Sequence, residues 1–115
     1  MSTPFSKISE TDVVAWITDH VRAHLKQGAG MGELELAIDQ ATRECRRQAL
    51  EVLVKEQVAA QPLVCPDCGQ RLNVEAYARL RNVNSSFGPI GFQRDYGFCA
   101  KCGKHTYPAD VAMGL

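Results

Sequence analysis

The sequence predicts an α+β protein whose first half is helical and whose second half is a small antiparallel ribbon of strands. Two observations support this fold class: apolar side chains recur at helical spacing over residues 11–60, and they alternate with polar ones over residues 72–98. The third is a pair of Cys-x-x-Cys-Gly motifs, at residues 65–69 and 99–103, which flank the alternating segment. At 115 residues the chain has room for one ordinary domain or for two small parts. We expect two parts, divided after residue 62.

The first predicted helix spans about residues 11–26. Ser9 is suited to cap it, because a serine hydroxyl can accept the backbone N–H of Asp12, whose carboxylate then lies at the positive end of the helix dipole. Three glycines among residues 28–32 end the pattern, since glycine destabilises a helix interior. One apolar stripe runs along this helix: Val14, Ile17, Val21 and Leu25.

The second predicted helix spans about residues 33–60 and ends at the Gln61-Pro62 step, because proline disfavours a helical residue before it. Two arrangements of its apolar stripe are open: a hairpin in which the two helices pack together, or a homodimer through helix 33–60. Either arrangement predicts that Cys45 is a small buried hydrophobic residue. The stripe alternates at intervals of three and four, as in a coiled-coil seam: Met31, Leu34, Ile38, Ala41, Cys45, Gln48 and Val52.

The two cysteine motifs supply Cys65, Cys68, Cys99 and Cys102, and we expect them to bind one structural Zn²⁺. Structural zinc takes four ligands in a tetrahedron, and a gap of two residues lets both sulfurs of a pair reach one ion. Glycine after each second cysteine allows a tight turn, because glycine adopts positive φ without a steric penalty. The alternatives are disulfides, a redox dithiol, or iron in a rubredoxin-like site.

We therefore expect an N-terminal helical hairpin within residues 1–62, followed by a small antiparallel four-cysteine zinc ribbon over residues 63–115. The first residues, 1–7, lack the apolar segment of a secretory signal, which favours a cytoplasmic protein whose thiols stay reduced. No apolar run approaches the length of a membrane span. The sequence predicts neither a membrane segment nor a small-molecule substrate.

Between the motifs, residues 72–81 and 90–98 are predicted to be strands joined by a turn over residues 84–89. In the first strand, Leu72, Val74, Ala76, Ala78 and Leu80 are expected to form a dry face, with a basic face opposite.

The formal net charge is zero, so bulk charge gives no support for nucleic-acid binding. Basic residues nevertheless gather on and around these strands, and DNA is the partner that they would suit. The alternative is a solvated sheet face on which arginines pair with Glu75 or Asp95. The predicted nucleic-acid contacts are Arg71, Tyr77, Arg79, Arg81 and Arg94.

Three histidines are interpreted as lying outside the metal site. His20 and His24 are four residues apart on the first helix, without the acidic motif that accompanies helical zinc ligands, and are expected to be solvated. His105 is expected to be a loop residue near the site, because four thiols already complete a tetrahedron.

Four motifs of the second half follow one another in a recognisable order: Cys65-Pro66-x-Cys68-Gly69, Phe87-Gly88-Pro89-Ile90, Arg94-x-Tyr96-x-x-Cys99-x-x-Cys102-Gly103 and Tyr107-Pro108-x-Asp110-x-x-x-Gly114-Leu115. This order resembles the zinc-ribbon portion of Kra-type insertion-sequence transposases. The resemblance implies that the ribbon serves in DNA-end recognition or assembly, ahead of a ribonuclease-H-like catalytic domain. Because the chain stops about where that domain would begin, the resemblance carries over the ribbon cysteines and not the enzyme.

The function expected from the sequence is that of a transposase-derived zinc-ribbon protein, a DNA-binding or transposition-complex accessory module without enzyme activity. The alternative is a protein–protein interaction or dimerisation module, in which helix 33–60 binds the partner and the zinc ribbon is purely structural.

Overall fold

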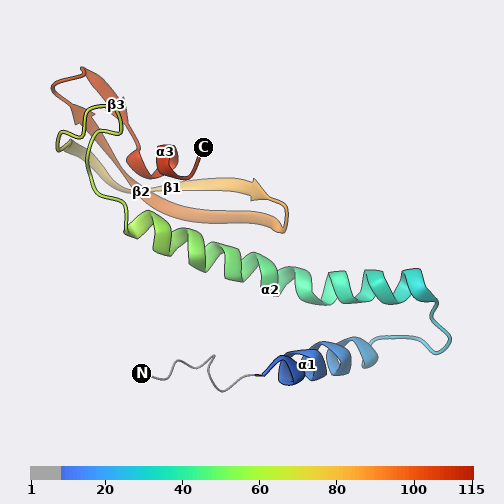
Figure 1. Ribbon diagram of the computed structural model, residues 1–115. Coiled ribbons are helices and arrows are strands. Elements are labelled where there is room, and N and C mark those ends of the chain that lie inside the picture. The colour runs from blue at the N-terminus through green and yellow to red at the C-terminus, as the bar shows by residue number, and fades with distance from the viewer. Residues whose placement is uncertain (1–8) are drawn as a thin grey trace. The chain divides into compact units, whose positions relative to one another are not determined.

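A computed structural model describes residues 9–115 of the chain (Figure 1). Residues 1–8 lie outside the described residues, and with them the segment that bears on a secretory signal and the beginning of the predicted 1–62 region. Helices in the first half and a three-stranded antiparallel sheet in the second confirm the α+β class. The elements are α1 (Glu10–Arg22), α2 (Met31–Ala59), β1 (Asn73–Ser85), β2 (Gly88–Cys99), β3 (Lys104–Thr106) and α3 (Pro108–Ala112).

The chain divides into two compact units between Arg46 and Arg47, within α2. The sequence places the division later, after residue 62, where the helical pattern stops. The earlier division follows from packing, because the second half of α2 contributes Val54 to a core that it shares with the strand residues Ile90 and Phe92. A helix can therefore be continuous in its backbone while its two halves belong to different units.

In the first unit, α1 begins with the predicted capping box. The Asp12 backbone N–H donates to the Ser9 hydroxyl at 3.2 Å, and the Asp12 carboxylate accepts the Ser9 N–H at 3.1 Å. The helix ends at Arg22, four residues before the predicted end. Its last turn is tightened, because the His24 N–H donates to the Val21 carbonyl three residues back. Val21 is the single buried apolar side chain among the described residues of this unit.

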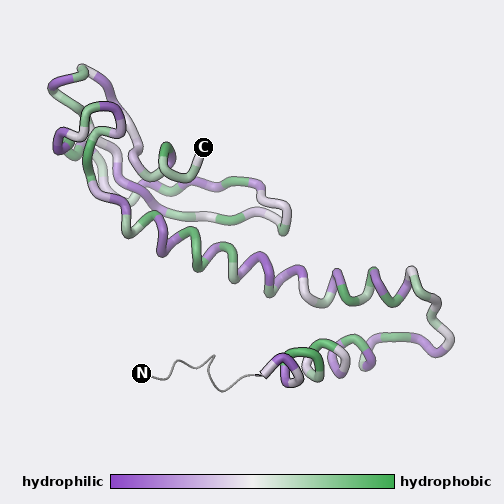
Figure 2. The backbone as a smooth tube through the Cα atoms, viewed as in Figure 1, coloured by the Kyte–Doolittle hydropathy of each residue, from purple (hydrophilic) through white to green (hydrophobic). Residues whose placement is uncertain are grey.

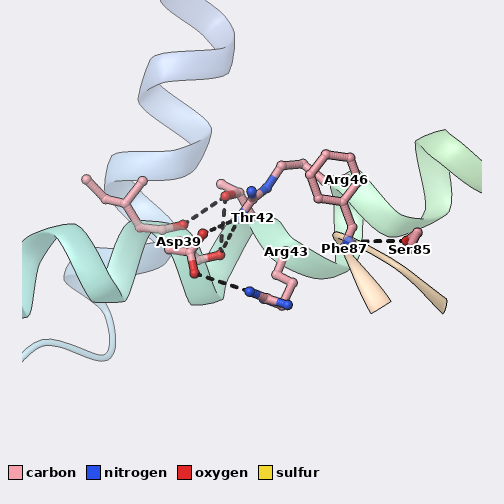
Figure 3. A network of polar contacts seen from close by, with 7 residues as sticks. Asp39, Thr42, Arg43, Arg46, Ser85 and Phe87 are labelled. Carbon is pink, nitrogen blue, oxygen red and sulfur yellow. Dashed lines mark hydrogen bonds and ion pairs between the residues drawn. The ribbon is translucent and has the colours of Figure 1, made fainter. Parts of the chain in front are cut away.

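The first half of α2 carries a polar network on one side (Figure 3). The Asp39 carboxylate accepts a hydrogen bond from Arg46 at 2.6 Å and lies 3.8 Å from the guanidinium of Arg43. The Arg46 hydrogen bond comes first in lowering the pKa of Asp39. The Thr42 hydroxyl donates to the Ile38 carbonyl at 2.9 Å. These polar groups find partners within the helix itself.

Cys45 is exposed, so the prediction that it is buried is wrong. The sequence pattern placed it correctly on the apolar side of α2, but no other part of the described chain covers that side at this position. Amphipathic spacing indicates which face of a helix is apolar. It does not indicate whether another part of the same chain covers that face.

In the second unit, β1 and β2 form a long hairpin and β3 adds to the far edge of β2, in the order β1-β2-β3 (Figure 1). Both long strands extend beyond the predicted bounds, so the turn is shorter than predicted. Ser85 and Gly88 face each other at its ends, and Gly88 takes a φ of 118° that favours glycine. The Ser85 hydroxyl also accepts the Phe87 N–H at 3.1 Å (Figure 3).

The main core lies where the second half of α2 covers the tip of the hairpin. Val54, Ile90 and Phe92 are buried there, and Phe92 is 1% exposed. A polar contact adds to this packing, since the Gly91 N–H on the open edge of β2 donates to the Glu51 carboxylate at 3.0 Å. Leu50, Val58, Val83 and Met113 surround the core.

A bulge in β1 changes which side chains face this core. The register against β2 shifts between Val74 and Ala76 and again between Ala76 and Arg79; in the second interval Ala78 takes a φ of 52° and donates its N–H to the Asp95 carboxylate at 2.9 Å. An extra residue on one strand inverts the alternation of faces beyond it. Leu80 is consequently 63% exposed, while Arg81 lies opposite the buried Phe92. The predicted dry face is therefore wrong from Ala78 onward, because Ala78 and Leu80 are exposed, and Arg81 leaves the predicted basic face.

The last helix, α3, is a single short turn that begins with Pro108, whose fixed φ suits a first helical position. Its Asp110 side chain is 9% exposed and lies among side chains of the sheet. None of the helices described here has the length and the apolar character needed to cross a membrane.

Candidate metal centre

The two cysteine motifs fold into hooks of matching geometry. In each, the glycine N–H after the second cysteine donates to the carbonyl of the first cysteine, at 2.8 Å for Gly69 to Cys65 and at 2.8 Å for Gly103 to Cys99. The two glycines take φ values of 75° and 68°, which the sequence anticipated from their positions. This turn brings both sulfurs of a hook to the same side of the backbone.

The hooks bring together all four predicted ligands: Cys65, Cys68, Cys99 and Cys102. Their sulfur atoms lie within 4.8 Å of one another. The Cys65 and Cys102 sulfurs are 3.9 Å apart, and the Cys68 and Cys99 sulfurs are 3.5 Å apart. A tetrahedron with metal–sulfur bonds of about 2.3 Å has edges of roughly 3.8 Å, so the four sulfurs fit around one metal ion.

The thiols also differ in acidity. A hydrogen bond from the Cys102 backbone N–H lowers the pKa of Cys99 to about 7, while the neighbouring sulfurs, Cys68 first, raise the pKa of Cys102 to about 12. All five cysteines of the chain are free, and none forms a disulfide. Four clustered thiols cannot all ionise without a compensating cation, which is the charge environment that a divalent metal would satisfy.

The base of the site is closed by Leu72, which is 5% exposed and packs with Cys65 and Cys99. The sheet comes close to it at Gly97, where an added Cβ would lie 3.0 Å from the Leu72 Cβ and 3.2 Å from the Asn73 carbonyl oxygen. A side chain at this position would push the first hook away from β2. Gly97 therefore permits the close approach of Leu72 to β2 beneath the cysteines, a role that no motif in the sequence indicates.

Two of the predicted nucleic-acid residues are tied to Asp110. Arg81 donates to the Asp110 carboxylate at 2.7 Å and Arg94 donates to it at 3.2 Å. The Arg94 side chain is 10% exposed, and it also donates to the Arg79 carbonyl at 2.8 Å. These two guanidinium groups hold α3 against the hairpin. Sequence reasoning did not identify Asp110 as their partner, although Pro108 marks the start of a helix that would carry it.

The other three predicted residues remain at the surface. Tyr77 is 71% exposed, and Arg71 is exposed beside the first hook. The guanidinium of Arg79 has no ion pair within residues 9–115, and it lies 5.6 Å from the ring centre of Tyr96 and 5.9 Å from that of Tyr107. A cation over aromatic rings keeps its N–H groups available to a further acceptor.

His105 is not a loop residue but the middle of β3. It lies 3.2 Å from the Glu75 carboxylate and stacks on Tyr96 with ring centres 5.4 Å apart. His20, on α1, and His24, in the turn just after it, are exposed as expected, with ring centres also 5.4 Å apart, although the sequence placed both on the first helix. Within residues 9–115, none of these imidazoles joins a cluster of three or more metal-ligating side chains, whereas the four cysteines do.

Comparison of the chain with protein-family models, with curated proteins and with solved structures finds no match.

Proposed function

We propose that this chain is a transposase-derived zinc-ribbon protein that binds DNA, or helps a transposition complex to assemble on DNA, without catalysis of its own. The single observation that carries the proposal is the four-sulfur cluster at the base of a long hairpin with an unpaired arginine, Arg79, among the described residues. The family resemblance of residues 65–115 supplies the biological setting, and a reducing cytoplasm would keep the thiols available.

Zinc is the metal that we assign to the cluster. Four thiolates in a tetrahedron suit Zn²⁺, which has no geometric preference of its own and serves in structural sites with all four positions filled. One zinc would fix the two hooks and hence the base of the hairpin. It would leave no open coordination position for chemistry on a substrate.

The DNA-binding surface is narrower than the sequence predicted. Arg81 and Arg94 are engaged with Asp110, so the contacts to phosphate fall to Arg79 and Arg71, with Tyr77 exposed on the same strand as Arg79. Two or three phosphate contacts give weak binding with a shallow dependence on salt. The proposed role is accordingly one contact among several in a larger complex.

The test is fluorescence anisotropy of labelled duplex and single-stranded oligonucleotides with zinc-loaded protein at low salt. Binding should weaken in Arg79→Ala, and the slope of log affinity against log salt should fall by about 0.7 to 0.9, the value of one phosphate contact. Arg22→Ala is the matched control, because it removes one exposed arginine from α1. No binding by the wild type, or equal losses in both variants, would refute the proposal.

A further inference from the structure

Arg79 lies beside two tyrosine rings that come from different parts of the second unit. Tyr96 is on β2, and Tyr107 is the residue that precedes α3. The Arg79 guanidinium is 5.6 Å from the ring centre of Tyr96 and 5.9 Å from that of Tyr107, within the range of a cation–π interaction. The two ring centres are themselves 4.6 Å apart. One cation therefore rests against two adjoining aromatic rings, which we call the tyrosine pair.

Both rings of the tyrosine pair are fixed by contacts that do not involve the Arg79 side chain. Tyr96 stacks on His105, with ring centres 5.4 Å apart. The guanidinium of Arg94, a side chain that is 10% exposed, lies 3.9 Å from the ring centre of Tyr107. Arg79, by contrast, is exposed, and a long exposed arginine has many rotamers. The rings thus form a fixed surface that restricts an otherwise flexible side chain.

Tyr107 connects this contact to the fold of the second unit. It directly precedes α3, whose Asp110 accepts hydrogen bonds from Arg81 and Arg94. Arg94 also donates to the backbone carbonyl of Arg79 at 2.8 Å. The ion pairs of Asp110 therefore help to fix both the backbone of Arg79 and one of the rings on which its side chain rests.

The middle of the hairpin has hydrophilic positions on both strands (Figure 2), yet the carboxylates in and beside it are engaged with groups other than Arg79. Glu75 lies 3.2 Å from a histidine of β3, Asp95 accepts the backbone N–H of the bulge at 2.9 Å, and Asp110 binds two other arginines. Within residues 9–115 the Arg79 guanidinium forms no ion pair. Because a cation–π contact uses the charge of a guanidinium and not its N–H donors, these donors stay available to an oxyanion.

We propose that Tyr96 and Tyr107 are positioning residues that hold the Arg79 guanidinium ready for an oxyanion, which here is a phosphodiester of the DNA backbone. The inference rests on the proposed function, in which Arg79 contacts phosphate, and adds two residues that act through Arg79. A free arginine side chain loses rotamer entropy when it binds, and this loss weakens binding. The tyrosine pair orders Arg79 beforehand, so less entropy is lost when phosphate binds.

Two substitutions of Tyr107, in the full zinc-loaded chain, isolate the contribution of the aromatic ring. Tyr107→Leu removes the ring and keeps an apolar side chain, whereas Tyr107→Phe, the matched control, removes only the hydroxyl. The Tyr107 side chain makes no capping hydrogen bond to α3, so neither change removes a cap. In NMR spectra the Cδ protons of Arg79, assigned by their absence in Arg79→Ala, should lose part of their ring-current shift in Tyr107→Leu and keep it in Tyr107→Phe.

A double-mutant cycle with labelled DNA at low salt gives the second readout. Tyr107→Leu should weaken binding by about two- to five-fold, which corresponds to the roughly 0.5–1 kcal/mol of an exposed cation–π interaction. In the Arg79→Ala background the same change should have no effect, whereas a purely structural role would weaken binding equally in both backgrounds. Tyr107→Phe should bind DNA as the wild type does. Tyr96→Leu repeats the cycle at the second ring and replaces Tyr107→Leu if that variant loses its amide dispersion.

The outcomes separate this inference from the proposed function. An unchanged Arg79 signal in Tyr107→Leu, or equal losses of affinity in the two backgrounds, overturns the inference while DNA binding by the wild type keeps the proposed function. Absence of DNA binding by the wild type overturns both. Loss of the ring-current shift, together with a loss of affinity confined to chains that carry Arg79, supports the role of the tyrosine pair.

Discussion

The two units of this protein contain similar amounts of amphipathic pattern but bury it very differently. The second unit, residues 47–115, has a core around Phe92 and a sulfur cluster packed on Leu72. The first, over the described residues 9–46, buries Val21 and leaves Trp16 half exposed. In the second unit, a hairpin, a helix and four thiols bury apolar side chains against one another. The two helices of the first unit bury little apolar surface between them. The difference shows that a helical stripe needs a covering surface before it contributes stability.

The largest expected effect comes from removing a metal ligand from the second unit. Cys99→Ser should lower metal affinity by more than about 100-fold and destabilise the ribbon by more than about 3 kcal/mol, because a metal ion held by the four cysteines would stabilise a unit whose own core is small. Metal content by mass spectrometry and dispersion of amide signals in NMR would measure both. Cys45→Ser, outside the cluster, should change neither, and equal metal content in both variants would contradict a four-cysteine site.

The next effect compares the two cores directly. Phe92→Ala should cost about 3–5 kcal/mol of unfolding free energy, because it empties the best-buried position of the second unit. Val21→Ala removes two methyl groups from the first unit and should cost only about 1–2 kcal/mol. Denaturant unfolding of the metal-loaded protein gives both values, and a Val21 variant as unstable as the Phe92 variant would mean that the first unit has a core of its own.

A third prediction concerns the buried carboxylate that joins α3 to the hairpin. Asp110→Ala should cost about 3 kcal/mol, because Arg94, at 10% exposure, would lose its counter-charge. Asp67→Ala is the control: its partner Lys104 is 68% exposed, and such a pair contributes less than about 1 kcal/mol. Thermal unfolding compares them, and similar midpoints for the two variants would show that Asp110 is replaceable.

The smallest expected effect is a dependence of folding stability on pH that comes from Glu51. A hydrogen bond from Gly91 comes first in lowering its pKa below the ordinary 4.5, followed by the charges of Lys55 and Arg47. Because the folded-state pKa is depressed, the stabilisation is complete above the ordinary value and is lost as the pH falls through the lowered pKa. The difference in melting temperature between the wild type and Glu51→Gln should therefore shrink between about pH 6 and pH 3. A difference that does not change with pH would exclude the ionised carboxylate as its source.

Much of the fold follows from spacing that can be read in the sequence. The helices, the two long strands and the four clustered cysteines were predicted, because amphipathic periods and the Cys-x-x-Cys-Gly hooks are local patterns. The capping box at Ser9 was predicted from the same kind of local chemistry. That the metal is zinc, that the partner is DNA and that the role is accessory all stay predictions.

What the sequence could not reveal depends on single backbone irregularities and on distant partners. The apolar alternation through Leu80 continues as if β1 were regular, and nothing marks Ala78, an alanine, as a residue of positive φ. The pairing of Asp110 with Arg81 joins residues 29 positions apart. The exposure of Cys45 reflects the absence of a covering element within the described chain, which periodicity does not report.

The contact between Glu51 and Gly91 also changes the chemistry of one open edge of the sheet. Strand β3 pairs with β2 only over residues 97–99, so the earlier part of that edge carries no further strand within residues 9–115. Unpaired edges attract strands of other molecules. The Glu51 carboxylate accepts one of the edge N–H groups and places a negative charge there, and Pro89 lacks an N–H altogether. The residue that holds the helix to the hairpin thus also occupies a position on the β2 edge at which a strand of a neighbouring molecule could otherwise pair.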